Sequence, residues 1–180
     1  VLSMFKAMAD RLIARVQRRA PDFVIGGSDN PYLLRWFLIP RNPVFNVYLH
    51  KFMRSDDDRA LHTHPWLFNA SLLLSGQYRE WAMNPRRHDS MLEPAHYPVL
   101  RSAGEFKFRW GLAPHRLELV TLAEYVRTQP DNTTPLPCWT LFITGPRVRQ
   151  WGFFCPQGFV HWRDFTAPGD AGAVGRGCDQ

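Results

Sequence analysis

The feature that most constrains the fold is the regular punctuation of the chain from Pro31 to residue 167. Short runs that are apolar, or that alternate apolar and polar residues, are separated by Gly, Pro, Asn and Asp about every ten residues. This spacing is typical of an all-β sandwich or barrel. The predicted strands lie near residues 33–39, 45–53, 66–74, 77–82, 98–101, 106–110, 115–121, 138–144, 150–155 and 159–165.

The 180 residues are enough for one domain with a hydrophobic core and too few for two. We expect residues 1–30 to form an N-terminal helix and linker, and residues 31–167 to form a β-barrel. Residues 168–180 are rich in Gly and lack periodicity, so we expect a loosely ordered, flexible tail.

An amphipathic helix is predicted over residues 2–19, because apolar residues recur there at steps of three and four. The apolar stripe consists of Leu2, Phe5, Met8, Leu12 and Val16. Two interpretations stay open at this point. The helix can cap the barrel or pack in a homodimer, or it can bind a partner or a membrane surface.

The formal charge is +6, from 22 Lys and Arg against 16 Asp and Glu. The densest basic segment, Arg11–Arg19, lies on the predicted helix, and the other arginines are spread along the chain. A dispersed charge keeps the surface solvated, so we do not expect a nucleic-acid partner. No apolar stretch approaches the roughly 18 residues of a membrane span, so we expect no membrane partner either.

Three cysteines, Cys138, Cys155 and Cys178, are an odd number without a CxxC pair. This pattern argues against a disulfide framework and against a structural zinc knuckle. We expect a buried, unreactive thiol at Cys138 and a cytoplasmic location for the protein.

The pattern with most chemical content is His62-Thr63-His64. On an extended strand, residues two apart point to the same face, so both imidazoles aim into one space. Neutral imidazole is the commonest metal ligand in proteins, and two on one strand offer two adjacent coordination positions. The pair alone is a weak signal, because most such pairs lie on the surface.

The spacing around this pair resembles the cupin family. Its first motif runs Gly, five residues, HxH, three or four residues, Glu, six residues, Gly; its second runs Gly, five residues, PxG, two residues, His, three residues, Asn. His62, His64 and Gly76 match the first motif, and Gly104 and His115 match the second. The resemblance covers roughly residues 45 to 165.

Five positions depart from the family pattern. Asp56 replaces the first Gly, where a turn of acidic residues can make the same bend. Asn69 stands at the Glu position, Trp110-Gly111-Leu112 replaces PxG, and Leu119 replaces the final Asn. The Glu-to-Asn change leaves a neutral, weaker donor beside the histidines.

The resemblance implies a double-stranded β-helix barrel in which His62, His64 and His115 hold one divalent transition metal. Asn69 is a further candidate ligand, or else it hydrogen-bonds a bound water or substrate. A mostly three-histidine site suits Fe(II), which we favour, and also Zn(II), Ni(II) or Mn(II). Such sites keep open positions, as a catalytic centre requires.

Other polar residues are candidates for the surroundings of the metal. Tyr48 and His50 share a strand face and are candidate catalytic groups, as a hydrogen-bond donor and a proton shuttle. Arg35, Arg79 and Arg109 lie within predicted strands, where an inward guanidinium would bind a substrate carboxylate or phosphate. Each also has a plainer explanation, as a rim histidine or a solvent-facing arginine.

These residues favour a metal-dependent dioxygenase that acts on a small organic molecule. Two alternatives remain open. One is a non-catalytic cupin module that binds metal or ligand. The other is a metal-free sugar-nucleotide isomerase or epimerase, which would contain a buried contact between a histidine and a carboxylate.

Overall fold

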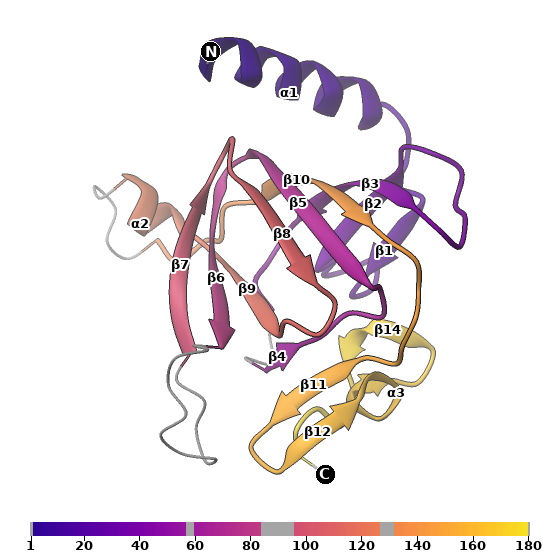
Figure 1. Cartoon of the computed structure of the whole chain (residues 1–180). Coiled ribbons are helices and arrows are strands. Elements are labelled where there is room, and N and C mark those ends of the chain that lie inside the picture. Colours follow the sequence, from indigo (N-terminus) through magenta and orange to yellow (C-terminus); the bar gives the residue numbers. More distant parts are fainter. Residues whose placement is uncertain (1, 57–59, 84–95, 127–131, 180) are drawn as a thin grey trace.

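The computed structural model of the protein describes residues 2–56, 60–83, 96–126 and 132–179. Two six-stranded antiparallel sheets face each other and enclose the core (Figure 1). The predicted all-β, double-stranded β-helix architecture with an N-terminal helix is therefore confirmed. Among the described residues, every helix is too short or too polar to cross a membrane.

The first sheet has the strand order β1-β2-β3-β10-β5-β8. Its strands are β1 (Phe23–Ile25), β2 (Leu33–Phe37), β3 (Asn46–Phe52), β5 (Phe68–Ser75), β8 (Phe106–Trp110) and β10 (Cys138–Thr144). The strand β10 pairs with both β3 and β5, so it joins the early and middle parts of the chain.

The second sheet has the order β12-β11-β4-β9-β6-β7. Its strands are β4 (Leu61–His62), β6 (Gln77–Met83), β7 (His96–Ser102), β9 (His115–Leu119), β11 (Gly152–Cys155) and β12 (Gly158–His161). A short helix, α2 (Leu122–Val126), follows β9.

The helix α1 (Leu2–Val16) covers the outer face of the first sheet (Figure 1). Its buried residues Ala9, Ile13 and Val16 pack against Trp36, Leu49, Leu74 and Trp139 of that sheet. Met8, which the predicted stripe included, is 64% exposed. The true apolar face is therefore turned toward the Ala9 side, and the helix caps the barrel as one of the two interpretations expects.

The interior between the sheets is filled by Leu33, Phe52, Leu73, Tyr78, Leu117, Leu119 and Cys138. Gly76 makes the tight turn from β5 to β6 with φ = 86°, a backbone conformation that favours glycine. A Cβ at this position would come within 2.8 Å of the Cys138 side chain. The glycine therefore lets the turn pack directly against β10.

The C-terminal segment differs from its prediction as a loosely ordered tail. After α3 (Trp162–Phe165), the strands β13 (Thr166–Ala167) and β14 (Asp170–Val174) form a two-stranded sheet. A disulfide joins Cys155 of β11 to Cys178, contrary to the prediction from the odd cysteine count. Phe165, which is 1% exposed, stacks on Phe153 and gives this segment a small core of its own.

Candidate metal centre

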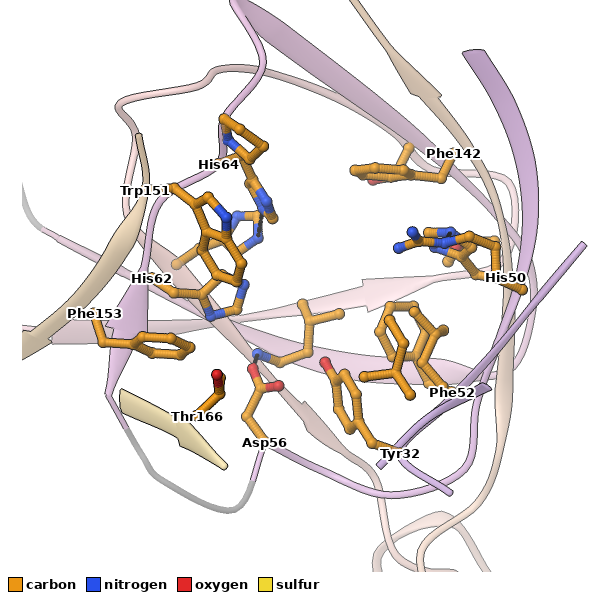
Figure 2. A pocket seen from close by; sticks show the side chains of 18 of the residues that line it. Tyr32, His50, Phe52, Asp56, His62, His64, Phe142, Trp151, Phe153 and Thr166 are labelled. Atoms are coloured by element: carbon orange, nitrogen blue, oxygen red, sulfur yellow. Dashed lines mark hydrogen bonds between the residues drawn. The ribbon is translucent and has the colours of Figure 1, made fainter. Parts of the chain in front are cut away.

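Neighbouring strands bring the three predicted metal ligands together. His62 lies on β4 directly opposite His115 on β9. His64 lies just beyond the end of β4, and Thr63 between the two histidines is buried with its hydroxyl bonded to the backbone of Gly152. The alternation predicted for an extended segment is thus kept, and Figure 2 shows His62 and His64 on one wall of a cavity.

The backbone around His64 is held by a close contact with the loop that precedes β9. The amide of His64 donates to the carbonyl of Gly111 at 3.0 Å. A Cβ at Gly111 would overlap the Trp66 carbonyl, so only glycine permits this approach. The imidazole of His64 also stacks on Trp66, with ring centroids 5.4 Å apart. These contacts fix the ring against the cavity wall.

The geometry of the three imidazoles fits a single metal ion. Their ring centroids are 5.0 to 5.2 Å apart, which makes an almost equilateral triangle. One nitrogen from each ring lies within 4.8 Å of those from the other two. The Nε2 atoms of His64 and His115 are 3.1 Å apart. Two nitrogens bound to one ion at about 2.1 Å are expected to be separated by about 3 Å, so the spacing suits a shared metal.

The protonation of the three rings also fits metal binding. Burial lowers the pKa of His64 and His115 well below the ordinary value of 6.5, and nearby positive charges lower it further. Burial lowers the pKa of His62 as well, although the charge of Asp56 opposes this effect. The rings are therefore neutral at physiological pH, which is the form that coordinates metals.

A buried carboxylate, Glu80, lies behind His115 and was missed by the sequence interpretation. Its Oε1 is 3.5 Å from Nδ1 of His115, close but without a hydrogen bond in this geometry. Glu80 also accepts hydrogen bonds from Arg109 and Arg101. A carboxylate behind a ligating imidazole commonly fixes its tautomer and orientation.

Arg79, a predicted substrate-binding residue, points away from the cavity. It pairs with Glu124 at 2.5 Å and with Glu118 at 3.5 Å on the outer face of β6. The strand alternates, so Glu80 and Tyr78 face inward and Arg79 faces outward. The prediction was wrong because a choice of strand face that is off by one residue exchanges the inward and outward side chains.

Arg109 lines the cavity, but its charge is already neutralised by a buried carboxylate. Its Nε donates to Glu80 at 2.6 Å, and the guanidinium makes an ion pair with the same carboxylate. A further hydrogen bond reaches the Ser71 hydroxyl. This pairing makes Arg109 part of the support behind His115.

Asn69 is fully buried on the face of β5 that it shares with Ser71. Neither amide atom has a hydrogen-bond partner among the residues that the structure describes. It lies opposite Arg109 on one side and Thr144 on the other, and it does not line the cavity. Metal ligation by Asn69 therefore stays a prediction.

The wall opposite the histidines carries Arg35 on β2 and His50 on β3, which are direct partners in the sheet. Arg35 Nε donates to His50 Nε2 at 2.8 Å. Tyr48 is buried against His50 and lies beneath the Arg35 guanidinium. It is not among the residues that line the cavity, in contrast to its prediction as a catalytic group there. Because His50 Nε2 is engaged by Arg35, the geometry favours a positioning role for His50 over proton shuttling.

The cavity between the two walls has a volume of about 340 Å³. Apolar side chains surround its middle, and the C-terminal segment closes one side with Trp151, Phe153 and Phe165. The ring of Phe153 lies 5.7 Å from that of His62, between centroids. In Figure 2, Trp151 and Phe153 flank His62, while His50 lies across the open space.

Cys138 takes no part in the site. Burial raises the pKa of its thiol to about 12, so it is protonated and unreactive at neutral pH, as predicted.

Comparison with known proteins gives similarity at the level of fold. No family model matches the chain, and no curated protein matches it. Similar solved structures include an uncharacterised conserved protein with a double-stranded β-helix domain from Klebsiella pneumoniae subsp. pneumoniae MGH 78578. The two are 13% identical with a TM-score of 0.45, over 72% of this chain and 90% of that one.

Two enzymes are similar at the same level. For the Fe(II) form of HppE in complex with substrate, the identity is 11% and the TM-score 0.47, over 71% of this chain and 57% of that one. For oxalate oxidase the values are 11% and 0.46, over 76% and 60%. The chain thus spans less than two thirds of either enzyme, and the likeness says nothing about activity. The two facing antiparallel sheets give this chain a double-stranded β-helix architecture, in which three histidines converge.

Proposed function

We propose that the protein is a metal-dependent oxygenase that acts on a small organic molecule, with Fe(II) as the favoured metal. The observation that carries the proposal is the convergence of three neutral imidazoles at one end of the cavity. The metal would be held by His62, His64 and His115. When bound, it supplies Lewis acidity and open positions for substrate and O2.

The cavity supports a catalytic rather than a purely structural site. Structural metal sites are closed by four protein ligands, whereas catalytic sites keep an open position. Among the described residues, the His, Cys, Asp and Glu side chains that could share a metal here are the three histidines alone. The remaining positions face a space large enough for a small molecule. A dioxygenase places both atoms of O2 in its product, so the reaction needs no external reductant.

The test is anaerobic loading with Fe(II), followed by O2 uptake across a panel of small acids, thiols and diketones. Turnover by the wild-type protein that is lost in His62→Ala supports the proposal, and the incorporation of two ¹⁸O atoms identifies a dioxygenase. The matched control is His161→Ala, because that histidine bonds to Gln150 outside the cavity. Stoichiometric metal that raises the melting temperature without any turnover would instead favour a non-catalytic binding module.

A second candidate function is a metal-free isomerase or epimerase. It is favoured by the buried approach of Glu80 to His115 Nδ1, the kind of contact that such an enzyme would use for acid–base work. However, the Glu80 carboxylate is already occupied by ion pairs with Arg101 and Arg109. Full activity in protein stripped by a chelator would select this candidate.

The predicted homodimer and cytoplasmic location stay predictions. Size-exclusion chromatography with light scattering tests the first, and fractionation of the source cells tests the second. The disulfide bears on the location, since such bonds are rare in reducing compartments.

A further inference from the structure

Three arginines line the cavity, and they differ in the partners that their guanidinium groups bind. Arg109 is paired with the buried carboxylate of Glu80. Arg54 donates to the carbonyl of Asn30 at the edge of the barrel. Arg35 forms no ion pair with any carboxylate in the described part of the chain. The cavity therefore holds one half-buried cation, Arg35, without a carboxylate partner among the described residues.

Arg35 is held in a fixed orientation. Its Nε donates to His50 Nε2, and the guanidinium carbon lies 4.9 Å from the centre of the Tyr48 ring. The bond to Nε requires the His50 proton to sit on Nδ1, and burial keeps the ring neutral by lowering its pKa well below 6.5. The two Nη groups are the donors that remain for a ligand.

The charge of Arg35 persists despite its surroundings. Burial lowers its pKa to about 10, and the guanidinium is therefore still protonated at neutral pH. A buried charge is costly unless an opposite charge accompanies it. An anion that enters the cavity would supply this partner.

We propose that the substrate is a small organic monoanion whose carboxylate binds the two Nη groups of Arg35. A planar carboxylate matches a guanidinium edge with two parallel hydrogen bonds, and a single cation balances one negative charge. The body of the molecule lies along the apolar middle of the cavity, against Leu33, Phe52 and Phe142. Its far end reaches the three histidines, of which His62 and His64 face His50 across the cavity in Figure 2.

This proposal names the substrate class of the oxygenase proposed above, yet it can be tested without turnover. The probes are acetate, butyrate, benzoate and 3-phenylpropionate, each compared with its uncharged amide of nearly the same shape. Isothermal titration calorimetry on the full chain measures both members of each pair, in chelator-treated protein and again after loading with redox-inert Zn(II). We expect at least one acid to bind about tenfold tighter than its amide in both forms.

Variants assign the preference to Arg35. Arg35→Met is expected to bind acid and amide equally, and Arg35→Lys to keep part of the preference because it keeps the charge. Arg79→Met is the matched control, since it removes an arginine that faces away from the cavity. If Arg35→Met does not fold, the acid and amide affinities of the wild type and of Arg35→Lys decide the question.

Three results would overturn the proposal: no preference for any acid in the wild type, a preference that survives in Arg35→Met, or one that is lost in Arg79→Met. Failure of the oxygenase proposal gives a different pattern. In that case the acid preference persists in chelator-treated protein, while no metal binds or no O2 is consumed.

Discussion

The histidine wall of the cavity (His62, His64 and His115) and the arginine wall opposite it (Arg35 and His50) are incomplete in opposite ways. The first wall presents three neutral nitrogen donors, and none of its three described residues carries a positive charge. The second presents a fixed cation without a carboxylate. A metal completes one wall and an organic anion completes the other. The two walls thus form sites of different chemistry, because the nitrogen atoms of the first lack a metal ion and the guanidinium of the second lacks an anion.

The largest expected effect separates the two walls by metal content. His115→Ala removes one of three ligands and is expected to lower metal affinity more than about hundredfold, beyond the loss usual for residues behind a ligand. His50→Gln is the matched control, since it changes another buried histidine of the same cavity and keeps an acceptor for Arg35. Elemental analysis after dialysis measures both. Equal metal loss in the two variants would contradict the division of the walls.

A second prediction concerns the support behind the histidine wall. Glu80→Gln leaves Arg109 without a full counter-charge in a buried setting, and we expect a loss of about 3–5 kcal/mol in the free energy of unfolding. Glu118→Gln removes a half-exposed partner and should cost about 1 kcal/mol or less. Urea denaturation of both variants checks the contrast. Similar losses would show that Glu80 is not the anchor of this wall.

The C-terminal segment beside the histidine wall is held by the disulfide between Cys155 and Cys178. Cys178→Ser opens a loop with a sequence separation of 23 residues. Loss of such a cross-link is expected to lower the unfolding free energy by about 3 kcal/mol. Thermal and urea denaturation, with and without dithiothreitol, measure the effect. Reductant should bring the wild type down to the level of the variant; a reductant effect that persists in Cys178→Ser would point to another cause.

The pH dependence of the metal-free protein should reflect both walls. Burial holds the pKa values of His50, His62, His64 and His115 below 6.5 in the folded state. The unfolded chain therefore binds more protons below pH 6.5, and stability should fall as the pH drops from 6.5 to 5 and stay flat above 7. The slope is about 1.4 kcal/mol per pH unit for each histidine that becomes charged on unfolding. A flat stability profile down to pH 5 would mean that these rings are not buried and neutral.

The histidine wall was largely predictable from the sequence. The pair His62 and His64 is local, and the spacing to His115 matches a known motif, so no knowledge of strand pairing was needed. The strand pattern likewise gave most of the first sheet, because turn residues mark its boundaries. Very short strands such as β4 and β13 were not predicted, since two residues carry no periodic signal.

The rest of the site depends on long-range register, which a single sequence does not encode visibly. The bond between Arg35 and His50 follows from the pairing of β2 with β3. The inward position of Glu80 depends on the face that β6 turns to the core, and the same choice sends Arg79 outward. The bridge between Cys155 and Cys178 depends on how the C-terminal segment folds back, so counting cysteines could not find it.

The most direct test of the account is a crystal structure of metal-loaded protein with anomalous diffraction recorded at the absorption edge of the bound metal. The account predicts one strong peak, about 2.0–2.3 Å from a ring nitrogen of each of His62, His64 and His115. A peak elsewhere in the molecule, or none in protein that contains stoichiometric metal, would contradict it.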